Sequence, residues 1–384
     1  MKVYLDNAAT TPIDPSVLQV MYEVMESTYG NPSSIHAHGR EARSLIERAR
    51  KKIANLLNTS PSELFFTSGG TEAHNAALWG SIAAYKPEQV ITSPIEHHAV
   101  LHTLEALKGE GMIRLRYVQV DGQGRVDLDH LGQLLQLHDK GKSLVSLMHA
   151  NNEIGTLLDL DATAAICREH KALFHCDTVQ TVGHYPHDLE RSGMHFMACA
   201  AHKLHGPKGV GFLYVNHRVR IPAFLHGGAQ ERNMRGGTEN VYGIVGMAKA
   251  LEIAVLNMEE HRKHIQGLKS YLIGRLQETI PGVRFNGPLE PEESLYTVLN
   301  VSFPPTEMAE MLLFNLDING ISASGGSACS SGSNIGSHVL TAIGADPDRP
   351  AVRFSFSKFT TREEIDYTVE KLGEFAFQCN FNKI

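Results

Sequence analysis

The sequence predicts an α/β protein built around a mostly parallel sheet, with a second and smaller α/β domain. Short apolar runs alternate with segments of helical composition from about residue 63 to residue 215, which is the pattern of successive βαβ units. From about residue 240 a long, mainly helical stretch follows, and a smaller set of strands and helices ends the chain. A chain of 384 residues has room for roughly two domains.

The elements of the larger domain can be followed in order. Residues 16–58 are expected to form helices interrupted by a loop at 29–34, because YGNPSS is rich in turn-forming residues. The strand-like runs that follow are ELFFTS at 63–68, QVITS at 89–93, IRLRYVQV at 113–120, SLVSLMHA at 143–150, ALFHCD at 172–177 and GVGFLYV at 209–215. The helical segments between them are TEAHNAALWGSIAAY at 71–85, HHAVLHTLEALKG at 97–109 and DATAAICREHK at 161–171. Runs that are apolar throughout are typical of strands covered on both faces.

The smaller domain follows a mainly helical stretch at 239–280. Its expected strands are YTVLNVSF at 296–303 and AVRFSF at 351–356, and its expected helices are MAEMLLFNL at 308–316 and REEIDYTVEKLGEFAF at 362–377. These elements are too few for a large sheet, so they predict a small α/β unit.

Composition narrows the classes of partner. The formal net charge is −7 and no basic run of five residues occurs, so we expect no nucleic acid and no anionic membrane as partner. No segment approaches 18 consecutive apolar residues, and the N-terminal MKVYLDNAATTPIDP lacks a signal-peptide core. The five cysteines are odd in number and form no C-x-x-C pair, which favours free thiols in a reducing cytoplasm.

A Gly-Gly turn and two charged residues point to a cofactor. In FFTSGGTEAHN a strand leads through Gly69 and Gly70 into a helix that opens at Thr71, and this helix end could bind a phosphate or could only be capped. Asp177 ends a buried strand, where α/β proteins bind ligands, and Lys203 lies in the glycine-rich AAHKLHGPKG. Either charged residue alone could belong to a surface ion pair. An acid for the pyridinium nitrogen, a lysine for the Schiff base and a phosphate cradle together suit pyridoxal phosphate.

Two other features raise questions of function. His98 and His102 lie four apart in EHHAVLH, a spacing that could bind a metal or could belong to a solvated helix face; without an H-E-x-x-H motif we expect no metal site. Cys329 lies in the loop GGSACSSGS, which is too poor in large side chains to form a core, so its thiol is either reactive or incidental.

The ordered motifs of the chain resemble those of cysteine desulfurases of the NifS/IscS kind, pyridoxal phosphate enzymes of the class V aminotransferase group. The resemblance runs from about Tyr4 to Tyr367 and is carried by YLDNAATTP, GNPSS, FTSGGTE, EHHAV, NNEIG, HCDTVQ, AHKLHGPKG, GGAQERNMRGGTEN, SGGSACSSGS and RFSFSKFTT. It implies an aspartate aminotransferase-like fold: a large cofactor-binding domain at 15–255 with a mostly parallel seven-stranded sheet, and a small domain from 1–14 and 256–384.

The resemblance also implies site residues, a homodimer and an activity, which is the transfer of sulfur from L-cysteine to the enzyme with release of L-alanine. The catalytic residues would be Lys203 for the Schiff base, Cys329 as sulfur acceptor and His97, which would stack on the cofactor ring and act as a base. The cofactor would be bound by Gly70, Thr71, His97, Asn152, Asp177, Gln180, His202, Lys203 and, from the neighbouring subunit, Thr238. Asn152 and Arg353 would bind the substrate carboxylate, and a sulfur-acceptor protein, such as an iron–sulfur scaffold, would take the persulfide.

One position departs from the family pattern. Relatives usually have a serine or threonine three positions before the lysine, where this chain has Ala200, so one hydrogen bond to the cofactor phosphate should be missing. Four alternatives remain open: a selenocysteine lyase, a desulfurase-like protein that acts on another amino acid, a plain aminotransferase, which would not need the Cys329 loop, and a catalytically silent cofactor-binding protein, which Ala200 favours. Cys167, Cys176 and Cys199 are expected to be packing residues, and Cys379 has no functional interpretation.

Overall fold

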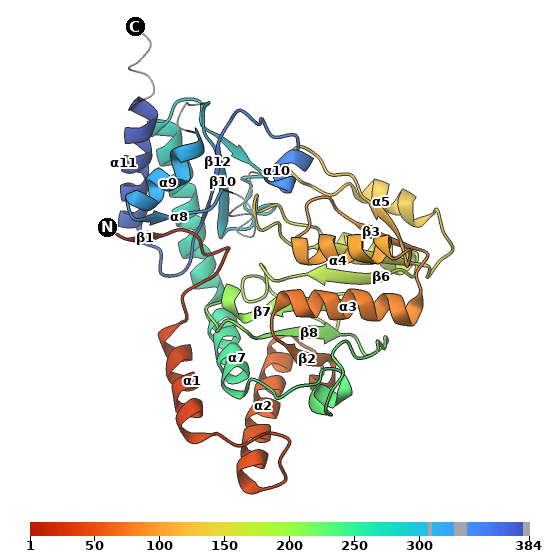
Figure 1. Cartoon of the computed structure of the whole chain (residues 1–384). Coiled ribbons are helices and arrows are strands. Elements are labelled where there is room, and N and C mark those ends of the chain that lie inside the picture. The colour runs from red at the N-terminus through yellow and green to blue at the C-terminus, as the bar shows by residue number, and fades with distance from the viewer. Residues whose placement is uncertain (306–308, 326–335, 379–384) are drawn as a thin grey trace.

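The computed structural model describes residues 1–305, 309–325 and 336–378 and confirms the predicted α/β class (Figure 1). Its centre is a seven-stranded sheet of order β2-β8-β7-β6-β5-β3-β4. Its strands are β2 (Leu64–Thr67), β3 (Gln89–Thr92), β4 (Arg114–Tyr117), β5 (Ser143–Met148), β6 (Leu173–Asp177), β7 (Phe196–Ala200) and β8 (Gly211–Val215). Only β8 runs against its neighbours, so the sheet is mostly parallel, as predicted.

Strands β5, β7 and β8 are buried along their whole length, which explains why their sequences are apolar without alternation. Strand β7 was not predicted, because FMACA is short and holds alanine and cysteine rather than β-branched residues. Its register places Ala198 beside Asp177 of β6. The strand that precedes Lys203 therefore lies next to the strand that ends in Asp177.

Helices surround the sheet, and some of them pack on other helices rather than on its strands (Figure 1). They are α1 (Pro15–Ser27), α2 (Ala37–Leu56), α3 (Gly70–Tyr85), α4 (His98–Gly109), α5 (Leu128–Leu135), α6 (Leu160–Glu169) and α7 (Val241–Leu256). Helix α5 was not predicted, and the stretch expected to be mainly helical is broken at Asn257 into α7 and α8 (Met258–Thr279), at a bend of 74°. In the described part of the chain no single helix has the length and apolar character to cross a membrane; α7 and α8 meet that test only as a bent pair.

The remaining elements gather near both chain ends (Figure 1). A three-stranded antiparallel sheet has the order β12-β10-β9, and β1 pairs in parallel with β11. These elements are β1 (Val3–Tyr4), β9 (Arg284–Asn286), β10 (Val298–Ser302), β11 (Ile321–Ser322), β12 (Ala351–Ser355), α9 (Leu312–Ile318), α10 (His338–Ala342) and α11 (Arg362–Gln378). Except for α10, they share a second apolar core with α8, separate from the core of the large sheet; Val339 of α10 packs in a small cluster with Ile95 and Ile154. The division at residues 14/15 and 255/256 stays a prediction.

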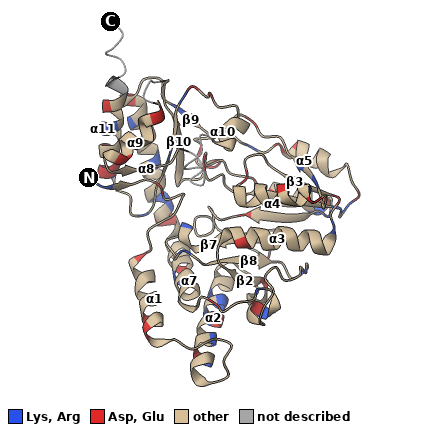
Figure 2. Cartoon of the chain, viewed as in Figure 1, with Lys and Arg blue, Asp and Glu red and all other residues tan. Residues whose placement is uncertain are grey.

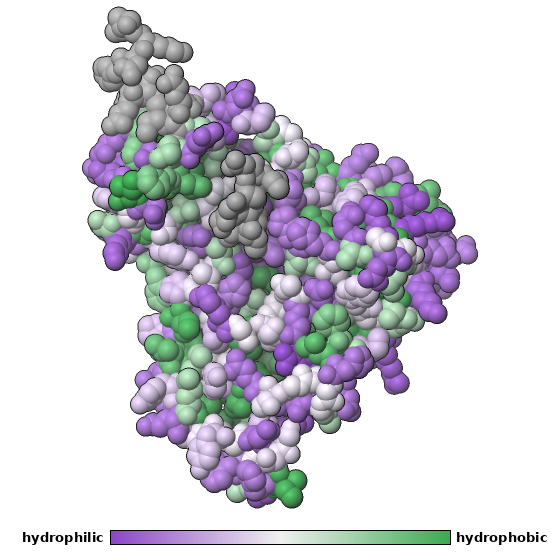
Figure 3. Space-filling view, viewed as in Figure 1, coloured by the Kyte–Doolittle hydropathy of each residue, from purple (hydrophilic) through white to green (hydrophobic). Residues whose placement is uncertain are grey.

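Two surface properties bear on partners. Basic and acidic residues are interspersed over most elements (Figure 2). Helix α1 exposes apolar side chains at helical spacing, with Leu18, Tyr22 and Met25 each more than half exposed. Green apolar patches interrupt the polar surface in this lower part of the molecule (Figure 3). An exposed apolar stripe of this kind is typical of a surface that contacts another protein.

Candidate active site

A cavity of about 230 Å³ lies where the carboxyl ends of β5 and β6 meet the start of α3. This is the edge of a parallel sheet at which α/β proteins bind ligands. Among its lining residues are nine of the predicted site residues: Gly70, Thr71, His97, Asn152, Asp177, Gln180, His202, Lys203 and Arg353. Thr238 is exposed and does not line the cavity, and Cys329 lies outside the described residues.

The first turn of α3 faces this cavity through Gly70, one residue before the predicted helix start at Thr71. A Cβ on Gly70 would lie 2.9 Å from Cγ2 of Val179, so only glycine fits there. The Ala200 side chain lies close by and offers no hydrogen-bond donor. The N–H groups and positive dipole end of a helix of 16 residues suit an anion, although Ala200 adds nothing to its binding.

Lys203 ends the short 3₁₀ helix η2 (Ala201–Lys203), directly after β7. Its Nζ donates to the backbone carbonyl of Ala9 at 3.0 Å and to that of Ala8. Gln180 donates to the same Ala8 carbonyl at 3.1 Å. The N-terminal segment therefore forms one wall of the cavity and orients its lysine.

Asp177 has a buried partner that the sequence analysis missed. Nε2 of His74 lies 3.2 Å from Asp177 Oδ2, and the N–H of Val179 donates to Oδ1 at 2.9 Å. Burial opposes ionisation, but the neighbouring His74 and these hydrogen bonds hold the pKa of Asp177 well below its ordinary value. The signal was available, since His74 lies four positions after Gly70 and so shares its helix face.

The hydrogen bonds extend from His74 to two further buried side chains. Its Nδ1 lies 3.1 Å from Nε2 of His175, whose Nδ1 lies 2.8 Å from the hydroxyl of Ser146. Burial lowers the pKa of His175 to about 3, so this ring is neutral near pH 7. The neutral His175 ring joins Ser146 to His74, and these contacts fix His74 with Nε2 against the Asp177 carboxylate. The chain fixes a donor on the carboxylate and keeps Asp177 an anion.

His97 caps the N-terminus of α4, where its Nδ1 accepts the N–H of Ala99 at 3.1 Å. Burial lowers the pKa of His97 to about 4, although Asp177 favours its charged form. The ring is therefore neutral near pH 7, and the capping bond leaves Nε2 as the nitrogen that can exchange a proton with a ligand.

The preceding residue, Glu96, is fully buried, and burial raises the pKa of its carboxyl to about 8. Its Oε1 accepts the hydroxyl of Ser93 at 2.7 Å and the N–H of Met148 at 3.1 Å, whereas Oε2 has no partner within the part of the chain that the structure describes. The carboxyl is mostly protonated at pH 7, and it ties the segment before His97 to the end of β5.

Arg353 on β12 is 1% exposed and enters the cavity from the second sheet. Its Nη2 contacts Asp6 Oδ1 at 2.9 Å and its Nη1 donates to the Asn152 carbonyl at 3.0 Å, while its buried Nε has no partner among the described residues. An unsatisfied guanidinium N–H is costly, so a carboxylate of a ligand would satisfy it.

The histidine pair of the sequence analysis lies outside this cavity. The rings of His98 and His102 stack with centroids 4.6 Å apart, and His338 of α10 lies 4.5 Å from His98. The face is therefore partly covered rather than solvated. In residues 1–305, 309–325 and 336–378 no group of histidine, cysteine and acidic side chains could hold a metal ion.

The structure also places the cysteines that the sequence analysis assigned to packing. The thiols of Cys167, Cys176 and Cys199 are free and buried, and burial raises the pKa of Cys167 to about 12. This confirms the packing assignment, because a thiol that stays protonated is a poor nucleophile. Cys379, like Cys329, lies outside the described residues.

Comparison with known proteins gives a consistent result. A family model described as aminotransferase class-V matches residues 3–368. The chain is 43% identical over 375 residues to the cysteine desulfurase IscS of Dictyoglomus turgidum, covering 97% of this chain and 93% of that one. It is 42% identical over 378 residues to the putative cysteine desulfurase IscS 1 of Bacillus subtilis, covering 97% and 98%. A solved structure of a NifS-like protein superposes with a TM-score of 0.90 at 41% identity, covering 98% of this chain and all of that one.

Proposed function

The chain belongs to the class-V aminotransferase family, and from this we propose that it is a cysteine desulfurase that converts L-cysteine to L-alanine. The observation that carries the proposal is the convergence of nine predicted site residues from distant segments in one cavity. In the reaction the Cβ–S bond of L-cysteine breaks and an S–S bond forms on Cys329. One thiol proton stays on the persulfide and the other ends on the methyl group of L-alanine, so no external oxidant is needed.

The cavity fits pyridoxal phosphate. We propose that the start of α3 at Gly70 and Thr71, with His202, holds the phosphate, and that Gln180 contacts the ring hydroxyl. Lys203 would hold the cofactor covalently through Nζ, and Asp177, kept anionic by the His74 chain, would hold the ring nitrogen protonated. When bound, the cofactor supplies an electron sink for the bonding electrons at the substrate Cα.

The substrate carboxylate would bind at Arg353 and Asn152. The buried Nε of Arg353 has no partner in the described chain, and the planar fork of a guanidinium suits a carboxylate. Asp6 and the Asn152 carbonyl occupy other donors of this side chain, so they fix its orientation before the substrate arrives. We expect this preorganisation to reduce the entropy lost when L-cysteine binds.

We assign the proton transfers to two groups. Lys203 would move the Cα proton, since its Nζ lies in the cavity beside the Ala8 and Ala9 carbonyls. His97 would exchange a proton at Nε2 and help to form the attacking thiolate, because an unperturbed cysteine has a pKa of about 8.5. Its low pKa means that the neutral ring is available over the whole physiological range.

The described residues on either side of the Cys329 segment support its role as sulfur acceptor. Ser324 pairs with Arg353 through two backbone hydrogen bonds, and Ser337 donates to Glu153, next to Asn152. The two described ends of the segment that contains Cys329 therefore contact residues that line the cavity or adjoin its lining. Five residues of extended chain span at most about 18 Å, so a chain that starts at Ser324 can bring Cys329 to the substrate sulfur.

We also propose that the protein forms a homodimer and passes its sulfur to a second protein. The exposed apolar stripe of α1 suits a homodimer interface, and Thr238, exposed in one chain, would reach the phosphate of the neighbouring subunit. A sulfur-acceptor protein would take the persulfide. The reaction needs a reduced Cys329 thiol, which agrees with the cytoplasmic location that cysteine usage predicts.

The test is the production of sulfide and alanine from L-cysteine by protein loaded with pyridoxal phosphate, in the presence of a thiol reductant. We expect equal amounts of both products. Cys329→Ala should keep the yellow cofactor colour and lose sulfide release, whereas Cys167→Ala, which changes a buried thiol, should keep activity. Sulfide release by Cys329→Ala at the original rate would show that the acceptor assignment is wrong. No product from yellow wild-type protein would refute the activity.

A further inference from the structure

A second hollow lies at the opposite edge of the seven-stranded sheet. It forms where β6 and β7 begin and β8 ends, whereas the candidate active site lies at the carboxyl end of β6. Its volume of about 890 Å³ exceeds that of the active-site cavity and falls in the range of small-molecule sites. None of the described residues assigned to the desulfurase reaction lines it, so what it binds is independent of the proposed function.

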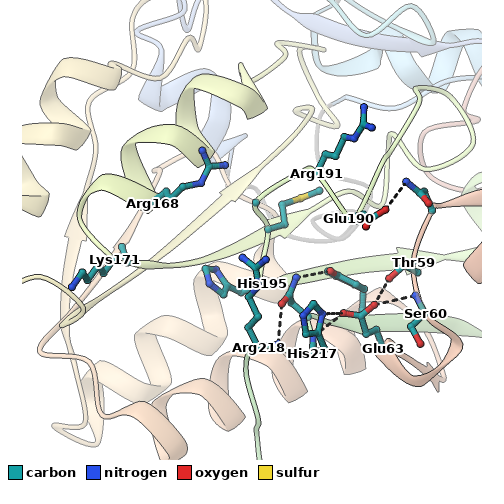
Figure 4. A pocket seen from close by; sticks show the side chains of 16 residues that line it. Thr59, Ser60, Glu63, Arg168, Lys171, Glu190, Arg191, His195, His217 and Arg218 are labelled. Atoms are coloured by element: carbon teal, nitrogen blue, oxygen red, sulfur yellow. Dashed lines mark hydrogen bonds and ion pairs between the residues drawn. The ribbon is translucent and has the colours of Figure 1, made fainter.

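Cationic side chains surround this hollow. Arg168 and Lys171 come from the end of α6 and the turn after it, Arg191 from the loop before β7, and Arg218 from the segment after β8 (Figure 4). In the described chain Arg168, Lys171 and Arg218 form no ion pair, and Arg191 approaches only Asp188, at 3.8 Å. Four cations from separate segments thus share one hollow on a chain whose net charge is −7.

The two acidic residues of the lining already have partners. The carboxylate of Glu63 accepts hydrogen bonds from the hydroxyl of Thr59, the N–H of Ser60, and both the N–H and Nδ1 of His217. Glu190 accepts a weaker bond from Asn58, at 3.4 Å. Because Glu63 is held by its four donors, it closes one side of the hollow and does not reach across to neutralise the arginines.

The structure orients the His195 ring and leaves space for the Arg168 guanidinium. Nδ1 of His195 accepts the N–H of Phe174 at 3.0 Å, so the neutral ring carries its proton on Nε2, as a donor. A Cβ at position 193 would lie 3.0 Å from Nη2 of Arg168, so Gly193 leaves room for that guanidinium. Figure 4 shows His195 in the middle of the lining, with Arg168 and Arg218 on different sides.

We propose that this hollow is a binding site for a small polyanion that carries two or more phosphate groups. Guanidinium groups bind phosphate oxygens in pairs, and an 890 Å³ hollow with cations on several sides has more room and more donors than one phosphate needs. The one phenol ring of the lining, Tyr214, is 1% exposed, so no tyrosine face is open to a nucleobase, whereas four cationic side chains are available to phosphate oxygens. The phosphate groups themselves are therefore the recognised feature.

Isothermal titration calorimetry with inorganic triphosphate tests the proposal. The full chain is used after saturation with pyridoxal phosphate, so that the phosphate site of the active-site cavity is filled. The ionic strength is low and constant, because salt screens exposed charges. The comparison is wild type against the double variant Arg168→Gln/Arg218→Gln. The control is Arg114→Gln, on the exposed edge strand β4 at the far end of the sheet.

We expect wild type and Arg114→Gln to bind one triphosphate per chain with equal affinity, and the double variant to bind roughly 10- to 100-fold more weakly. Circular dichroism and the cofactor absorbance check that the variants are folded. Failure of wild-type protein to bind, or equal binding by the double variant, would overturn the site. A loss of the same size in Arg114→Gln would show general charge attraction instead. Tighter binding of citrate than of triphosphate would overturn the assignment to phosphate.

Discussion

Glu96 makes the stability of this protein depend on pH, and Glu96→Gln isolates that dependence. Burial raises the pKa of its carboxyl to about 8 from an ordinary value of 4.5, so the folded protein binds a proton that the unfolded chain releases. Between pH 4.5 and 8 the unfolded state therefore binds fewer protons, and the free energy of unfolding falls as pH rises. Glutamine cannot ionise, so the variant should not show this part of the decline.

The size of the effect follows from the shift. Each pH unit inside the window is worth about 1.36 kcal/mol, so wild type should lose about 2.5 kcal/mol relative to Glu96→Gln between pH 5.5 and pH 7.5. The measurement is urea denaturation of both proteins without cofactor at several pH values. The comparison uses the change with pH rather than the absolute difference, because an amide with an unsatisfied N–H has its own cost.

Glu63→Gln is the matched control. Hydrogen bonds from Thr59, Ser60 and His217 hold the pKa of Glu63 below its ordinary value despite partial burial, so its charge stabilises the fold near neutral pH. This variant should be less stable than wild type at pH 7.5, and the difference should shrink towards acid. Parallel stability curves for wild type and Glu96→Gln from pH 5.5 to 7.5 would refute the assignment of a proton to Glu96.

Three other measurements test the site and its surroundings. Arg353→Lys should raise the KM for L-cysteine at least tenfold in steady-state kinetics, with a smaller effect on kcat, because an ammonium cannot replace the planar fork; an unchanged KM would exclude Arg353 from carboxylate binding. Ala200→Ser should lower the dissociation constant of pyridoxal phosphate several-fold in a fluorescence titration, because a hydroxyl restores a hydrogen bond to the phosphate. Equal affinities of wild type and Ala200→Ser would mean that other groups already satisfy the phosphate. Burial lowers the pKa values of His149 and His175 to about 3. The unfolded chain therefore takes up protons first, and urea denaturation of Glu96→Gln, which lacks the opposite contribution of Glu96, should show stability falling as pH drops from 6.5 towards 3; a flat profile of this variant from pH 6.5 to 4.5 would contradict these values.

Much of the large sheet could be predicted because its strands are apolar runs separated by helical segments. Strand β7 was missed, since Phe196 favours a strand but its alanines and Met197 favour a helix, and only the neighbouring strands β6 and β8 define it. The break at Asn257 was missed as well, because the sequence on both sides has helical composition.

The site could be predicted as a set of motifs, but the contacts behind it could not. Asp177 and Lys203 belong to local patterns that the chemistry of the cofactor explains. His74 and His175 lie 101 positions apart and meet only when α3 packs on the sheet, so neither local pattern predicts their hydrogen bond. Asp6 reaches Arg353 across 347 positions for the same reason.

That last contact sets an order of events during synthesis. Asp6 and Asn7 leave the ribosome almost first, yet their partners Arg353 and Ser355 are made almost last. At 5–20 residues per second the interval is roughly 20–70 s. The large sheet can form in this time. The segment with Ala8 and Ala9, whose carbonyls bind Lys203, cannot yet be held in place, because its partners Arg353 and Ser355 have not been made. A nascent chain that stalls before residue 353 should therefore hold a folded sheet and an unfinished cavity.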